Sequence, residues 1–549
     1  MKFSVWILSS LFLSQSVWAG ELIYLGKTQK SAQNITSSSL ENAKAILGLE
    51  GEFRLLESKT SILETHFLYQ QTLQGYDIED SQIAFSVDKD SQIVKIYHSI
   101  LPLRQNSDDL VVPLISENMA FELAWNDLKG SGDLLDTPKA KVILSKNLNL
   151  VYKVEMALSS PYGHWISTID ARTGEVLSQV EESLPRMKRA ASAPAKIARA
   201  LKPFASAAAK LESQKISKML NVAFTTVNGV AQVFDPNPVA TLGRADLRDS
   251  SPASAFTNAY VKETLNEISF NNGVYTLTGP KVTLLDFDSP KKAITTSRDG
   301  SWIFERGQSG FTDSMTYIHI DRSIRYLETI GFRAQRAVFK KSLEADSDGE
   351  DGADNSSYTP SSRRLSFGHG KVDDNEDADV ILHELGHAIQ HQINPSWSGG
   401  DTGAMGEGFG DYWAASYSAD LPHGMDFHPE WVFKWDGHHA ETWPGRKLDV
   451  LKLTYEPKQT YDAHDEIKPG MMSDELWSTP LFQAFLELRS KGVLKADIDR
   501  IIIEAHFGLG SGLTMPQMAT AILKAAKALY PKKDYDQVFT RHFKNQKIL

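Results

Sequence analysis

The stretch ADVILHELGHAIQHQI, from Ala378 to Ile393, restricts the fold of this chain more than any other. Its apolar residues recur at helical spacing and predict an amphipathic helix. On that helix His383 and His387 project about 40° apart, and Glu384 is rotated off their common axis. Ionisable groups in an apolar run are costly to bury unless something pairs with them. The stretch therefore indicates a metal site, a catalytic site, or a core segment whose histidines find polar partners.

A metal site explains this spacing directly. Side chains four residues apart on a helix lie about 5–6 Å from each other at Cβ. Two imidazoles at that distance can converge on one Zn²⁺. Glu384 can then face a water molecule beside the metal without being a ligand, as in the H-E-x-x-H motif. An isolated match is only moderately specific, however, and ordinary histidines explain it about equally well.

A downstream glutamate supplies the missing ligand of such a site. Catalytic zinc is held by three protein ligands, and one position stays open. Glu407, in GAMGEGFGDYWAASY, follows His387 after nineteen residues, and its flanking glycines allow close backbone approach. Asp411 comes one helical turn later and can accept the free N–H of a ligating histidine, which fixes the tautomer. Because the chain has no cysteine, any metal must be held by His, Asp or Glu.

The chain is too long for one hydrophobic core. Alternating polar and apolar residues predict a meander of strands over Glu52–Ile100, and Ser116–Lys129 is typical of a capped helix. The segment Arg186–Lys215 holds eight Lys/Arg and ten Ala, which favours a solvated linker where proteases could cut. The remaining residues are strand-rich at first and helical from Phe311 onward. This order predicts a multidomain α+β protein with a cleft between sheet and helices.

The first residues, MKFSVWILSSLFLSQSVWAG, are typical of a secretory signal peptide cleaved after Ala19. No later stretch is long and apolar enough to predict a membrane span, so we expect a secreted or periplasmic protein. A net charge of −11 argues against nucleic acid as the main partner. The predicted division is a signal peptide (1–19), a first module (20–108), a second module (109–185), a linker (186–220) and a large domain (221–549).

HELGH, nineteen residues and then EGFGD resemble the thermolysin/fungalysin group of zinc metallopeptidases, the gluzincins. HFLYQQTLQGYDIEDSQIAFSVD is similar to the propeptide module of that group, and WISTIDARTGEVL is similar to a PepSY module. The resemblance implies two α+β prodomain modules and a thermolysin-like catalytic domain with zinc in its cleft. It also implies that the propeptide is an intramolecular inhibitor and that the substrates are proteins or peptides.

The resemblance implies a role for each matching residue. His383, His387 and Glu407 would be zinc ligands, and Glu384 would be the general base and later the general acid. Asn355, near ADNSSYTP, would bind the substrate backbone, although such a run is also typical of a plain turn. The implied activity is that of a metalloendopeptidase. An exopeptidase would need a group that captures the substrate N-terminus, and the sequence offers no clear motif for one.

One position departs from the pattern of the group. Its members carry an oxyanion-stabilising histidine six residues before the tryptophan of a G-E-x-W motif, and here Met471 precedes Trp477. A thioether cannot donate a hydrogen bond. Either His464 or Tyr461 takes over this role, or the protein is a catalytically weakened zinc- or peptide-binding relative of the same fold.

A second metal is also a hypothesis from the sequence. The run EADSDGEDGADN, Glu344–Asn355, has enough oxygen ligands for Ca²⁺. A solvated acidic loop is the alternative explanation.

Overall fold

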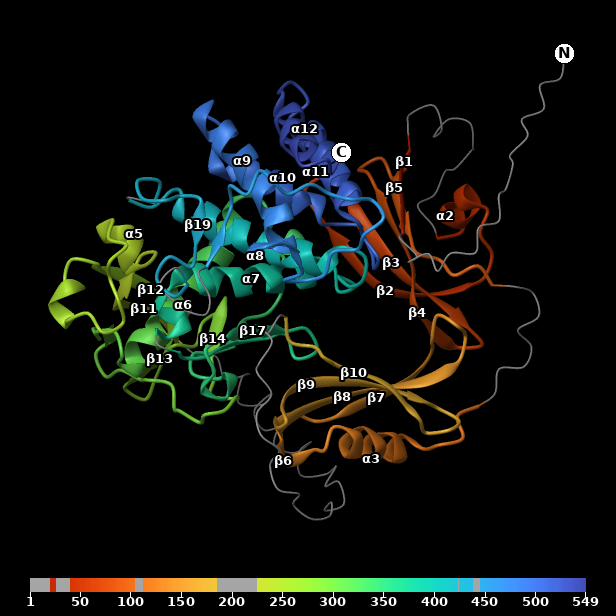
Figure 1. The fold of residues 1–549 in the computed structure, drawn as a ribbon, viewed down its shortest axis with the longest axis horizontal. Coiled ribbons are helices and arrows are strands. Elements are labelled where there is room, and N and C mark those ends of the chain that lie inside the picture. Colours follow the sequence, from red (N-terminus) through yellow and green to blue (C-terminus); the bar gives the residue numbers. More distant parts are fainter. Residues whose placement is uncertain are drawn as a thin grey trace.

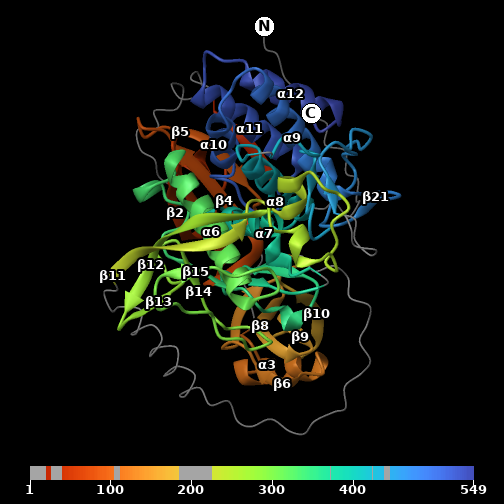
Figure 2. The ribbon, with the colours of Figure 1, turned by 90° about the vertical axis from the view of Figure 1, so that its left-hand side faces the viewer.

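The computed structural model describes residues 20–25, 40–103, 112–184, 225–370, 372–422, 424–437 and 445–549. These residues form a mixed α+β structure, as the sequence predicts. The predicted signal peptide and linker lie outside the described residues. The strands of the first module lie beside the C-terminal helices, and the second module lies at the opposite end of the molecule (Figures 1 and 2).

The N-terminal part of the chain is built on a ten-stranded sheet with the main order β1-β5-β4-β7-β8-β9-β10. Its first part contains β1 (Glu21–Tyr24), α2 (Leu40–Leu47), β2 (Glu52–Thr60), β3 (Thr65–Leu73), β4 (Tyr76–Val87) and β5 (Ile93–His98). Its second part contains α3 (Glu117–Asp127), β6 (Ser131–Leu134), β7 (Lys139–Leu144), β8 (Leu150–Ser160), β9 (Tyr162–Asp170) and β10 (Val176–Glu181). The predicted meander is therefore present as β2 to β5. The pair Ile78–Leu144 joins the two parts.

The helix α3 forms for the local reasons that its sequence suggests. Ser116 is its N-cap, and the serine side chain accepts a hydrogen bond from the Met119 N–H. Ala120, Phe121 and Ala124 lie on one face at helical spacing and are buried in a cluster with residues of β8. This cluster gives the second module a core of its own.

The first module has two differently occupied faces, because successive side chains of a strand point to opposite sides. Ile83 and Phe85 of β4 lie in a cluster with residues of α2. Ala84, between them, and Tyr97 of β5 belong to the same buried cluster as the large C-terminal domain. One face of the first module is therefore packed as part of the core of the large domain.

The large domain begins with two four-stranded sheets, β13-β12-β11-β15 and β14-β16-β18-β17. Their strands are β11 (Thr225–Phe234), β12 (Tyr260–Asn271), β13 (Val274–Thr276), β14 (Val282–Leu284), β15 (Ser301–Trp302), β16 (Leu343–Asp346), β17 (Ser356–Thr359) and β18 (Arg364–Phe367). The helices are α5 (Pro238–Leu242), α6 (Ser309–Thr329), α7 (Ala378–Ile393), α8 (Thr402–Ser418), α9 (Ser473–Ser490), α10 (Lys495–Ala505), α11 (Met515–Leu529) and α12 (Tyr535–Asn545). Short strands β19 (Trp431–Val432), β20 (Arg446–Lys447), β21 (Glu466–Lys468) and β22 (Met471–Met472) connect α8 to α9.

Two buried helices position the site. α6 packs between the strands β11 and β12 and the helix α7, and its apolar side chains Ile320 and Leu327 are fully buried there. α7 in turn lies against β17 on one side and α8 on another. Within the described residues, no helix is long and apolar enough to cross a membrane.

Candidate active site

Close contact between α7 and α8 brings the predicted ligands together. A methyl group built on Gly386 of α7 would lie 2.8 Å from the Cα of Gly410 of α8. One built on Gly410 would lie 2.6 Å from Nδ1 of His383. Only glycine fits at these two positions, so the EGFGD segment lets α8 approach the histidine helix.

The three predicted ligands converge at this contact. Nε2 of His383 lies 3.3 Å from one carboxylate oxygen of Glu407, and Nε2 of His387 lies 3.0 Å from the other. All three side chains are buried, and His383, Glu384 and His387 offer ligand atoms within 4.8 Å of one another. The arrangement joins a carboxylate from α8 to two imidazoles from α7.

The donor set fits a divalent cation. Nε2 of His387 and Oε2 of Glu384 are buried and have no hydrogen-bond partner among the described residues. Buried polar atoms in proteins are almost always paired. His387 faces Glu407 at 3.0 Å without the alignment of a hydrogen bond, which suits two ligands that point at a shared ion. Two imidazoles and one carboxylate are a known ligand set for catalytic zinc.

Asp411 lies where the sequence places it. Its Oδ1 is 3.1 Å from Nδ1 of His383, on the far side of the ring from Glu407. The pair lacks the alignment of a hydrogen bond, but a carboxylate beside this nitrogen leaves Nε2 to a metal.

Arg446, on β20, is a site residue that the sequence analysis missed. Its Nη1 lies 2.9 Å from Glu407 and 3.1 Å from Asp474, and its Nε lies 3.3 Å from Asp411. The guanidinium also lies 5.0 Å from the ring centre of Phe433. It follows a segment without regular periodicity, and nothing in its spacing marks it. Arg446 ties three buried carboxylates together and fixes the orientation of Glu407.

His464 reaches the ligand cluster, whereas the hydroxyl of Tyr461, the other candidate, bonds elsewhere. Its Nε2 lies 3.4 Å from Glu407, and its Nδ1 and backbone N–H both contact Asp474, at 2.6 and 3.0 Å. The hydroxyl of Tyr461 instead accepts the Glu456 N–H. Met471 pairs with Lys468 in the β21–β22 hairpin.

The backbone of His464 is strained. Its φ is 57°, in the left-handed region that non-glycine residues rarely adopt. Such a conformation costs on the order of 1–3 kcal/mol and is concentrated at functional sites. Here the two contacts to Asp474 hold His464 in this strained conformation. The conformation directs its imidazole toward Glu407.

Burial and neighbouring charges shift the pKa values of the ionisable groups at this site. Burial raises the pKa of Glu384 to about 8 and lowers the pKa of His387. Burial also acts to lower the pKa of His383, but Glu407 and Asp411 together outweigh it and bring the pKa to about 10. For His464, burial is likewise outweighed by Glu407 and Asp474, so its pKa is raised.

Asn355 lies directly before the edge strand β17, and its backbone carbonyl accepts the Gly368 N–H. A role in binding a substrate backbone stays a prediction.

The acidic run Glu344–Asn355 does not support the calcium hypothesis. Its carboxylates face different protein partners: Arg364 for Glu344, the backbone of Phe287 and Asp288 for Asp346, and His369 for Asp348. Asp354 instead lies near Asp374 and Asp436, from other segments. Each of the first three carboxylates has a protein partner, so the run does not gather its oxygens around one point.

Comparisons with known proteins identify the N-terminal module. Residues 51–100 match the Fungalysin/Thermolysin Propeptide Motif. A comparison with curated proteins finds no match. The precursor of protealysin, a metalloproteinase from Serratia proteamaculans, overlaps 46% of this chain and 84% of its own, with 12% identity and a TM-score of 0.34. The C-terminal domain of Bacillus megaterium YpeB overlaps 26% of this chain and 65% of its own, with 17% identity and a TM-score of 0.16.

Both TM-scores are too low to indicate a shared function. The propeptide motif confirms the resemblance to thermolysin/fungalysin-like metallopeptidases and supports a metalloprotease made as a proenzyme. The PepSY-like assignment of residues 109–185 and the domain boundaries stay predictions.

Proposed function

We propose that this chain is a secreted, zinc-dependent metalloendopeptidase made as a proenzyme. The observation that carries the proposal is the convergence of the Glu407 carboxylate on the Nε2 atoms of His383 and His387, with Glu384 beside them. Secretion is supported by the apolar N-terminal stretch that ends near Ala19.

In this proposal His383, His387 and Glu407 hold the zinc, which when bound polarises the scissile carbonyl and lowers the pKa of a water molecule. Glu384 takes the proton of the attacking water and passes it to the leaving amine. His464 donates a hydrogen bond to the oxyanion that develops on the carbonyl, the function that Met471 cannot perform. Arg446 and Asp411 keep Glu407 and His383 in position.

The end of the propeptide contacts the catalytic domain close to α7. The Leu184 N–H donates to the Tyr358 carbonyl at 3.1 Å, in an antiparallel bridge. Tyr358 belongs to β17, the outer strand of its sheet, which packs on α7. An outer strand offers free backbone groups to an extended peptide. Leu184 therefore occupies an edge that a peptide substrate would otherwise use, which supports the role of the propeptide as an intramolecular inhibitor.

Removing this backbone hydrogen bond should activate the uncut chain. Leu184→Pro deletes the N–H that reaches Tyr358, and we expect hydrolysis of a fluorescent casein by the full-length chain to rise several-fold. Leu184→Ala keeps the N–H and is the matched control. Equal activities of the proline and alanine variants would contradict a role for this bridge in inhibition.

Metal removal distinguishes the enzyme from a non-catalytic relative. After the linker is cut, the protein should hydrolyse casein, lose this activity on dialysis against a zinc chelator and regain it with about one equivalent of zinc. Full zinc binding with no hydrolysis of casein or of a peptide library would favour the alternative, a zinc- or peptide-binding protein of the same fold.

A further inference from the structure

A second contact between propeptide and catalytic domain is centred on Glu504, at the end of α10. One oxygen of its carboxylate accepts hydrogen bonds from the Ser61 hydroxyl at 2.5 Å and the Leu63 N–H at 3.1 Å. The other oxygen accepts the Ile62 N–H at 3.0 Å. Glu504 is 4% exposed, so almost all of its surface is covered in the docked state. One catalytic-domain carboxylate thus satisfies three donors of the turn between β2 and β3.

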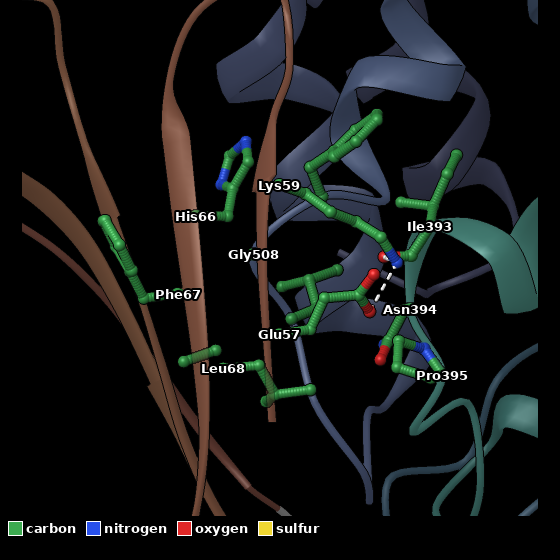
Figure 3. A pocket seen from close by; sticks show the side chains of 12 residues that line it. Glu57, Lys59, His66, Phe67, Leu68, Ile393, Asn394, Pro395 and Gly508 are labelled. Atoms are coloured by element: carbon green, nitrogen blue, oxygen red, sulfur yellow. Dashed lines mark hydrogen bonds and ion pairs between the residues drawn. The ribbon is translucent and has the colours of Figure 1, made fainter. Parts of the chain in front are cut away.

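Neighbouring side chains extend this contact along the same face. Lys95 of β5 donates to the Phe507 carbonyl at 2.7 Å, and the ring of His66 stacks on Phe507 with centroids 5.3 Å apart. Lys59 of β2 donates to the Ile393 carbonyl at 3.1 Å, in the last turn of α7. Figure 3 shows Lys59 reaching from its strand toward Ile393 across the small pocket between the two parts. A cation at this helix end is favourable, because the last carbonyls lack partners within the helix.

This face is separate from the edge that Leu184 covers. It is formed by β2, β3 and β5 of the first module, whereas Leu184 follows the last strand of the second module. It also touches different parts of the catalytic domain: α10, the segment after it and the C-terminal end of α7. One contact can therefore hold the propeptide while the other blocks the peptide-binding edge.

We propose that Glu504 and the Ser61–Leu63 turn form a docking latch that keeps the propeptide bound to the catalytic domain after the linker is cut. The partner that this surface of α10 fits is thus the cleaved propeptide itself. The proposal rests on the proposed proenzyme function. In it Glu504 holds the propeptide on the catalytic domain, and Leu184 blocks the peptide-binding edge of β17.

Exchanging one carboxylate oxygen of Glu504 for nitrogen should weaken the latch. In Glu504→Gln the new amide nitrogen is a donor and faces donors of the Ser61–Leu63 turn, so at least one hydrogen bond is lost. A buried donor left without a partner weakens an interface by roughly 10- to 100-fold. Ser61→Ala removes the hydroxyl donor from the propeptide side and leaves the catalytic domain unchanged.

The test uses the full chain with a recognition sequence for a site-specific protease inserted in residues 186–220. Glu384→Gln in every protein prevents self-digestion. After cutting, serial dilution and native mass spectrometry measure the dissociation constant of the two fragments. We expect a lasting one-to-one complex, a dissociation constant raised about 10- to 100-fold by Glu504→Gln and about 10-fold by Ser61→Ala, and no change with the exposed control Glu456→Gln. Leu184→Pro should change it by less than the latch variants.

Fragments that separate at once without any substitution would overturn the latch. So would Ser61→Ala and Glu504→Gln complexes that bind as tightly as the control. Because Ser61→Ala lies outside the catalytic domain, its result does not depend on correct folding of the Glu504 variant. The assay measures binding and needs no hydrolysis, so a stable latch in a protein without peptidase activity would refute the proposed function and leave the latch standing.

Discussion

Replacing Glu384 by glutamine should lower kcat/KM for casein by a factor of about 10²–10⁴ while zinc content stays unchanged. Glu384 lies beside His383 and His387, and its Oε2 has no hydrogen-bond partner among the described residues. No other hydrogen bond occupies this oxygen, so in its ionised form Glu384 can accept the proton of an attacking water. Glutamine fills the same volume but cannot accept that proton, and the proposed zinc ligands are untouched.

The measurement is steady-state hydrolysis with the cut protein, together with zinc analysis and a thermal melt of each variant. Glu456→Gln, at an exposed position, is the control for the substitution itself. Retention of more than about a tenth of the activity by Glu384→Gln would show that proton transfer occurs elsewhere.

The second large effect is expected at His464. Its Nε2 lies 3.4 Å from Glu407, and loss of one oxyanion donor typically costs about 10²–10³ in kcat. His464→Asn is the best substitution, because asparagine tolerates the φ of 57° better than other residues and removes the imidazole. We expect kcat to fall far more than KM changes.

Two matched variants test whether His464 rather than its neighbours has this role. Tyr461→Phe and Met471→Leu should each lower kcat less than about tenfold, since the Tyr461 hydroxyl accepts the Glu456 N–H and the Met471 thioether cannot donate a hydrogen bond. A loss of about 10²–10³ in Tyr461→Phe with nearly full activity in His464→Asn would reverse the assignment.

The convergence of His383, His387 and Glu407 was predictable because the sequence information for it is local. Helical periodicity predicts α7 with its observed ends. Glu407 and Asp411 both lie on the next helix, α8. The glycines around Glu407 predict close packing of this segment against a neighbour. Gly410 confirms this, because a Cβ atom at this position would clash with the His383 ring. Residues on two adjacent helices need only one tertiary contact to come together.

Arg446 and His464 were harder to assign for the opposite reason. Both lie between α8 and α9, where the described residues form only short strands and the sequence has no periodic pattern. Arg446 reaches the site through tertiary contacts with Glu407, Asp411 and Asp474, which no spacing rule encodes. His464 could be named as a candidate, but its orientation depends on Asp474, ten residues away.

The packing of the first module against the large domain could also not be predicted from the sequence. Alternation in β4 predicts a strand with two faces, yet it does not reveal that Ala84 belongs to the core of a domain that begins beyond the linker. Glu504 is similar. A single glutamate in an amphipathic helix is ordinarily a surface charge, and only the docked Ser61–Leu63 turn shows otherwise.

The most direct test of the central claim is a crystal structure of the zinc-loaded protein with anomalous data collected at the zinc absorption edge. We expect one strong peak, about 2.0–2.2 Å from Nε2 of His383, Nε2 of His387 and a carboxylate oxygen of Glu407. A peak elsewhere, or one from which Glu407 lies beyond bonding distance, would contradict it.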